Sequence, residues 1–134
     1  MKIAVFIVAL FMLACSGNPS AISKKLSGSD SLVITFNIPG TDSVLNTVST
    51  TEKKAIRQLS GFLDGKTTDQ KQCGFDGNMI FYKNGEKLLP VVFKYSSDSC
   101  RHFLFELDNK VMSTSMNNEA SAFFKSLAEG KTQY

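Results

Sequence analysis

The chain has 134 residues, of which 43% are hydrophobic and 20% are charged, and its formal net charge is +3. This length and composition indicate one globular domain. The charges are scattered and do not form the clustered basic surface that nucleic-acid binding requires, so we exclude that class of protein.

The first fourteen residues have the composition of a secretory signal peptide. Met1 and Lys2 supply a positive start, and an unbroken apolar run follows from Ile3 to Ala14. A helix that spans a bilayer needs about 20 apolar residues, so this run is too short to remain in the membrane as a helix. The competing interpretation is a buried N-terminal strand or helix. We expect residues 1–14 to be a signal peptide.

The end of this run resembles the lipobox of bacterial lipoproteins. The segment Met12-Leu13-Ala14-Cys15 carries the resemblance, with Met12 where the family usually has leucine and Leu13 where it prefers a small residue. In that family a diacylglycerol is attached to the cysteine thiol, and the signal is removed just before it. The resemblance implies that Cys15 is lipidated and that membrane lipid is a partner of the protein through Cys15.

Ordinary secretion is the alternative. Ala14-Cys15-Ser16 also fits a small-x-small site cut after Ser16, which would discard Cys15 and release a soluble protein. A cysteine directly behind the apolar run favours lipidation. We therefore expect a lipid-anchored protein of the bacterial cell envelope, at the outer membrane or the periplasmic face, with a secreted or periplasmic soluble protein as the alternative.

Residues 15–31 combine the expected lipidated cysteine with a serine-rich stretch that has no periodicity. Such a composition is typical of a flexible linker. A random coil of this length reaches roughly 20–25 Å on average, which would hold a domain clear of lipid head groups. We expect the folded domain to occupy residues 32–134.

Hydrophobic periodicity within that domain predicts the element order β-(β)-α-β-β-β-β-α. Strands have apolar residues at every second position, and helices have them at intervals of three and four. The expected strands cover residues 32–38, 43–48, 78–83, 88–95, 101–107 and 111–116, and the expected helices run from a capping-box pattern at 49–52 to Gly65 and from Asn117 to Gly130.

This order predicts an α+β two-layer sandwich, an antiparallel sheet of about five or six strands covered by two helices. An antiparallel sheet with one wet face needs cover on the other face, and two amphipathic helices supply it. The order of elements is also similar to that of helix-grip or TBP-like folds.

The cysteines predict one disulfide. If Cys15 is used in processing, Cys73 and Cys100 remain, an even number in an oxidising compartment. Both fall at the same end of the expected meander, but one strand separates them, so their strands lie about 9–10 Å apart. A disulfide needs Cα atoms within about 4.4–6.8 Å. Either residues 73–77 fold over the end of the middle strand, or the strand order brings the outer two strands together.

No residue pattern indicates catalysis, a cofactor or a metal. The only histidine, His102, is expected to face solvent on its strand, and Asp76-Gly77-Asn78 is expected to form a turn rather than a calcium loop. The phenylalanines fall mostly on core-facing positions and are expected to be packing residues. We therefore expect that the protein is not an enzyme.

Three functions remain open from the sequence. The first is a lipid-anchored envelope protein with a binding or structural role and a protein partner in the envelope. The second is an exported inhibitor or binder of an envelope enzyme, acting through an exposed loop such as Asp64 to Asn78. The third is a carrier of a small apolar ligand, held in a pocket between sheet and helices.

Overall fold

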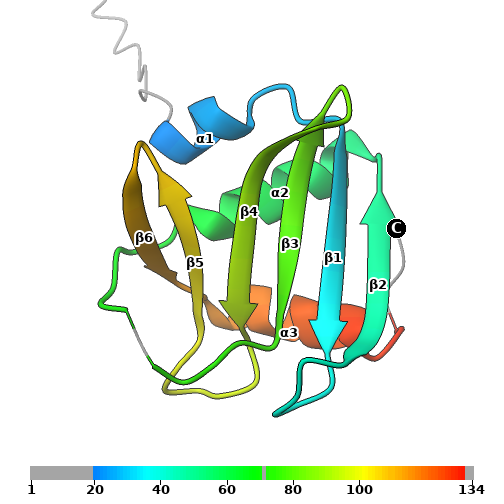
Figure 1. Ribbon diagram of the computed structural model, residues 1–134, viewed down its shortest axis with the longest axis vertical. Helices are drawn as coiled ribbons and strands as arrows, with labels where there is room; N and C mark the ends of the chain where they lie inside the picture. The colour runs from blue at the N-terminus through cyan, green and yellow to red at the C-terminus, as the bar shows by residue number, and fades with distance from the viewer. Residues whose placement is uncertain (1–19, 71, 132–134) are drawn as a thin grey trace, which may run out of the picture.

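The computed structural model describes residues 20–70 and 72–131. Six strands form one antiparallel sheet in the order β2-β1-β3-β4-β5-β6. In Figure 1, α2 and α3 cross behind the sheet and α1 lies at its upper end. The elements are α1 (Ala21–Leu26), β1 (Ser31–Asn37), β2 (Val44–Thr50), α2 (Lys53–Leu63), β3 (Gly77–Lys83), β4 (Glu86–Lys94), β5 (His102–Leu107), β6 (Lys110–Ser115) and α3 (Asn118–Ala128).

The predicted α+β class is confirmed, with all six expected strands in an open sheet and the predicted order of elements from β1 onward. The side chains of β1 show how the sequence builds the covered face. Leu32, Ile34 and Phe36 alternate along the strand and are at most 1% exposed. No helix of the described residues covers the opposite face of the sheet (Figure 1).

Phenylalanine rings join the sheet to α3. The ring of Phe93 on β4 lies 4.6 Å from that of Phe124 on α3, and the ring of Phe36 lies 5.6 Å from that of Phe93. The expected packing role is confirmed for the phenylalanines of the described chain, except for Phe75, which is 42% exposed.

The expectation of a flexible linker over residues 15–31 is wrong for residues 20–31, which are part of the folded domain. Ser20 begins α1, and its Oγ accepts a hydrogen bond from the N–H of Ser23 at 3.1 Å. Ile22 and Leu26 are four positions apart, so they share one helix face. Both are buried in the core, where α1 contacts α2 and β4. Residues 15–19 lie outside the described residues.

The start of α2 also differs from the expected capping box. Ser49 and Thr50 pair with Val33 and Leu32 of β1, so β2 continues through them. The N-cap is Glu52, and its side chain makes no capping hydrogen bond. Ser49 and Thr50, which the local sequence pattern assigned to the start of the helix, are therefore part of the sheet.

The two edges of the sheet are unequal. Along β6, the carbonyl oxygen of Lys66 accepts a hydrogen bond from the N–H of Ser115 at 2.8 Å, and the N–H of Thr68 donates to the carbonyl oxygen of Ser113 at 2.9 Å. The segment after α2 thus covers the second half of that edge, residues 113–115. In the described chain, β2 pairs only with β1, so its outer edge is open.

Candidate functional site

The predicted disulfide is present. Cys73 and Cys100 are bonded, with their Cα atoms 6.2 Å apart. Because β4 lies between β3 and β5, the first of the two expected routes holds, and the loop before β3 crosses the end of β4. The N–H of Asp76 donates to the carbonyl of Phe93 at 2.8 Å and marks this crossing.

The Asp76 side chain fixes the crossing loop. Its Oδ2 accepts hydrogen bonds from the N–H groups of Tyr95 at 2.8 Å and Ser96 at 3.0 Å, and Lys94 Nζ lies 3.3 Å from Oδ1. Burial raises the pKa of this carboxyl, but the hydrogen bonds to Tyr95 and Ser96 and the charge of Lys94 outweigh burial and hold the pKa below its usual value. Asp76 is therefore an ionised hydrogen-bond acceptor that holds the loop in place, which is more than the turn residue that the sequence predicted.

Asp76 also joins the loop to β1, because its carbonyl accepts the N–H of Asn37 at 2.8 Å. Gly77 follows at the start of β3, where a side chain would have no room. A Cβ at Gly77 would collide with the carbonyl oxygen of Thr35 and would lie 2.9 Å from the ring of Phe93. The expected strand begins at Asn78, which the structure confirms, but Gly77, which the sequence assigned to a turn, also belongs to β3.

His102 does not face solvent as expected; it is fully buried. Its side chain points to the helix-free face, as alternation predicts, but there the ring of Phe75 lies 5.8 Å from the imidazole. The Nδ1 atom of His102 is 2.6 Å from the carbonyl oxygen of Cys100. Because a carbonyl oxygen can only accept a hydrogen bond, Nδ1 is the donor of this hydrogen bond and carries the proton. Nε2 has no hydrogen-bond partner in the described structure.

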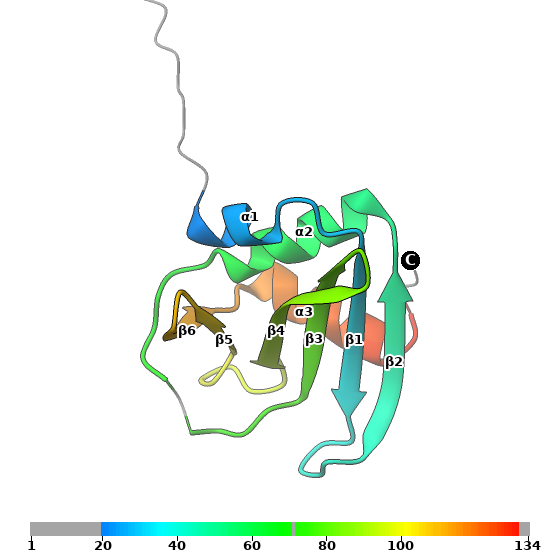
Figure 2. The ribbon, with the colours of Figure 1, turned by 45° about the horizontal axis from the view of Figure 1, so that its top comes forward.

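We call the end of the domain formed by residues 38–43, 72–76 and 95–101 the disulfide end, which lies at the bottom in Figures 1 and 2. Large apolar side chains are exposed at this end. Phe75 is 42% exposed and belongs to the crossing loop, and Ile38 is 42% exposed in the β1–β2 turn. Next to this turn, Val44 and Leu45 at the start of β2 are 58% and 52% exposed. The disulfide end therefore combines rigid anchoring with exposed apolar surface.

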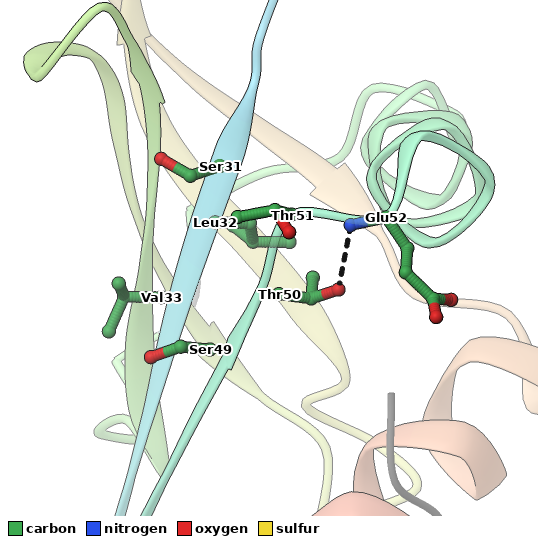
Figure 3. A pocket seen from close by; sticks show the side chains of 7 residues that line it. All are labelled: Ser31, Leu32, Val33, Ser49, Thr50, Thr51 and Glu52. Carbon is green, nitrogen blue, oxygen red and sulfur yellow. Dashed lines mark hydrogen bonds between the residues drawn. The ribbon is translucent and has the colours of Figure 1, made fainter.

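A pocket of about 330 Å³ lies at the opposite end of β1 and β2. Figure 3 shows Ser31, Val33 and Ser49 on one side of the β1 ribbon, and Thr50 and Glu52 on the other. The Oγ1 of Thr50 accepts the N–H of Glu52 at 3.1 Å. The pocket is thus an open depression at the rim of the sheet, lined mainly by polar side chains. The sequence-based hypothesis of an apolar-ligand carrier expects a pocket between the sheet and the helices, and this pocket does not lie there.

Cys15, the expected lipidation site, lies outside the described residues. Within residues 20–70 and 72–131, no helix is long and apolar enough to cross a membrane. The same residues contain no group of three or more histidine, cysteine or acidic side chains placed to hold a metal ion. Sequence reasoning found the disulfide but missed Asp76 as its neighbouring anchor; the signal was an acidic residue beside a glycine at the start of a strand.

Comparisons with protein families, curated proteins and solved structures found no match for this chain.

Proposed function

We propose that the protein is a lipid-anchored module of the bacterial cell envelope, in which acylated Cys15 holds the domain at a membrane and the disulfide end binds a protein partner. The observation that carries the proposal is the Cys73–Cys100 disulfide, which clamps a loop with an exposed aromatic side chain.

The disulfide supports export because such bonds persist in oxidising compartments and are rare in the cytosol. It also leaves Cys15 as the single unpaired cysteine of the chain. The lipobox-like segment that ends at Cys15 gives this remaining cysteine a role. Both arguments favour an anchored extracytoplasmic domain.

The disulfide end supports binding because aromatic side chains are enriched at protein interfaces and often dominate their energetics. Phe75 lies between two fixed residues, the bridged Cys73 and the hydrogen-bonded Asp76. A loop that is already ordered loses little conformational entropy when it binds. We infer that Phe75 is the main apolar contact for the partner.

The anchor is tested by mass spectrometry of the N-terminus of the protein from the membrane fraction. We expect a diacylglycerol-modified Cys15, and a Cys15→Ser variant should leave the membrane fraction. Ser16→Ala is the control, because it leaves the thiol in place. An unmodified chain that begins at Gly17 would contradict the anchor and favour soluble secretion.

The binding surface is tested by placing a photo-crosslinking amino acid at position 75 or at position 111 in cells. Val111 is the matched control, since it is also an exposed apolar residue at 54% exposure but lies on β6, away from the disulfide end. We expect a discrete cross-linked protein from position 75 only. Equal cross-linking from both positions would show that the disulfide end is not the binding surface.

An exported inhibitor is the second candidate, favoured by the same clamped loop. Inhibitors that present a preformed loop bind with little loss of entropy. This candidate predicts that the cross-linked partner is an envelope enzyme and that Phe75→Ala abolishes inhibition of that enzyme. A partner without enzymatic activity would favour the structural role.

A further inference from the structure

The folded α1 leaves a short connection between the domain and the proposed anchor. Only residues 16–19 separate Cys15 from Ser20, the N-cap of α1. Whatever their conformation, the distance between the Cα atoms of residues 15 and 20 cannot exceed about 18 Å, because an extended chain advances about 3.6 Å per residue.

The connection begins at one particular end of the domain. We call this the α1 end; it comprises α1, the start of α2, the β3–β4 turn and the β5–β6 turn, at the top in Figure 1. A domain of about 100 residues is roughly 30 Å across. The connection is shorter than that depth, so the disulfide end cannot reach the membrane while α1 stays packed.

Several contacts hold α1 in place. The side chains of Ile22 and Leu26 are 6% and 5% exposed, respectively, against the core. Just after the helix, the N–H of Asp30 donates to the Tyr82 carbonyl at 2.9 Å, and Oδ2 of Asp30 accepts the N–H of Asn84 at 2.8 Å. These bonds tie the segment after α1 to the β3–β4 turn, so the point of attachment is fixed relative to the sheet.

The α1 end also presents unpaired positive charge. Its lysines are exposed, and the ion pairs of the described residues include none of them. Its carboxylates are fewer. The lysines are Lys24, Lys25, Lys53, Lys54, Lys83, Lys87 and Lys110, and the carboxylates are Asp30, Glu52, Glu86, Glu106 and Asp108.

At the disulfide end the cations are neutralised instead. Lys94 lies 3.3 Å from Asp76, and Arg101 lies 2.6 Å from Asp98. The two ends of the domain therefore differ in the charge they offer to a membrane. Attraction between lysines and anionic lipid acts over about a Debye length, near 10 Å at 0.1 M salt. The connection of at most about 18 Å lets the α1 end come within that range, and the attraction then favours contact with the head groups.

We infer that the α1 end lies against the head groups of an anionic phospholipid bilayer and that the disulfide end points away from the membrane. The inference rests on the proposed acylation of Cys15 and deepens it, because it fixes which surface is left for a partner. It reverses the expectation that a long linker holds the domain clear of the head groups.

The orientation is tested with the full acylated protein in vesicles of phosphatidylglycerol and phosphatidylcholine that contain a head-group spin-labelled lipid. A fluorophore is attached to Ser27→Cys at the α1 end or to Asp42→Cys at the disulfide end. Both positions are exposed, and the native cysteines are acylated or bridged. We expect spin-label quenching at position 27 to be at least three-fold stronger than at position 42.

Charge is tested in the same vesicles by a Lys24→Gln/Lys25→Gln variant, which should lower quenching at position 27 by at least a third. The matched control is Lys125→Gln/Lys131→Gln, which also removes two positive charges, but from α3 and the residues after it. This control should leave the quenching at position 27 unchanged. Equal losses in the two variants would overturn the electrostatic contact. In vesicles of phosphatidylcholine alone, the labelled protein without the lysine substitutions should already show the reduced quenching at position 27.

The outcomes separate this inference from the proposed function. If the mass of the membrane-fraction protein shows no lipid on Cys15, both fail. If Cys15 is acylated and the two labels are quenched equally, or position 42 more strongly, only the orientation is overturned. A Gly/Ser insertion of sixteen residues between Pro19 and Ser20 should reduce the quenching at position 27; unchanged quenching would show that the short connection does not set the orientation.

Discussion

The Oδ2 atom of Asp76 accepts the main-chain N–H of Tyr95 at 2.8 Å, so a carboxylate just before β3 holds the residue just after β4. The same oxygen accepts the N–H of Ser96 at 3.0 Å. This contact closes the crossing loop over the sheet and lies three positions from bridged Cys73.

Asp76→Asn should destabilise the protein at neutral pH by about 2–4 kcal/mol, because the hydrogen bonds that the charged carboxylate accepts from the main-chain N–H groups of Tyr95 and Ser96 are lost. The folded state lowers the pKa of Asp76 below 3.8, so its stabilisation is complete above that pH. It is lost as the pH falls through the lower folded value. Urea denaturation at pH 7 and pH 3 should show that the difference between wild type and variant shrinks at pH 3.

Asp42→Asn is the control for Asp76, since Asp42 is exposed in the β1–β2 turn. It should change the free energy of unfolding by less than about 0.5 kcal/mol at both pH values. A difference for Asp76→Asn that is the same at pH 3 and pH 7 would contradict the ionised hydrogen-bond acceptor.

The disulfide should contribute about 3–4 kcal/mol to stability, because it closes a long loop in the unfolded chain. The two cysteines are 27 positions apart. A Cys73→Ser/Cys100→Ser variant should keep the circular dichroism spectrum of the native fold, since the core lies away from the bridge, and should unfold at lower urea. Reductant should lower the urea midpoint of the wild type to that of the variant and should leave the midpoint of the variant unchanged. An unfolded variant would show that the bridge is required for the fold itself.

Ile22→Ala and Leu26→Ala should each cost about 2–4 kcal/mol, as expected for large-to-small changes in a packed core. Ser23→Gln, on the exposed side of α1, is the control and should have little effect. A chain that begins at Ser31 should be destabilised by a similar amount in thermal denaturation. Equal stability of the shortened and the full domain would mean that α1 does not pack on the core in solution.

Two glycines should respond in opposite ways to alanine. Gly77→Ala should destabilise by more than about 3 kcal/mol, because its Cβ would collide with the carbonyl of Thr35 and force the backbone to move. Gly61→Ala, within α2 and with nothing within 4 Å of an added Cβ, should stabilise by about 0.5–1 kcal/mol through helix propensity. Chemical denaturation of both variants checks the pair; destabilisation of similar size in both would contradict the difference in space.

The parts of the fold that follow from local periodicity were predictable from the sequence. Alternation identified β1 and its buried face, Asn84-Gly85 identified the β3–β4 turn, and the spacing of apolar residues identified α2 and α3. Cysteine number and topology identified the Cys73–Cys100 bridge. Each of these signals lies within a few residues or follows from the order of strands.

The parts that depend on contacts between distant segments were not predictable. α1 has only six residues and two buried apolar side chains, so its helix depends on α2 and β4, which the local composition does not reveal. Alternation placed His102 on the helix-free face, but no local pattern shows that Phe75 covers it there. For the same reason the anchoring role of Asp76 appeared only with the crossing loop in place.

The unequal edges of the sheet limit how copies of this protein can associate through their strands. In the described chain, residues 66–68 pair with residues 113–115 and so cover the second half of β6, whereas β2 is open along its outer edge and carries no charged residue. A chain with two open edges can add copies without limit and grow into a fibril. Here β2 is the edge that offers its whole length, so pairing along a full strand joins two copies through their β2 strands, while the covered half of β6 hinders the addition of a third copy. If Cys15 is acylated as we propose, crowding of copies on a membrane would favour such pairs.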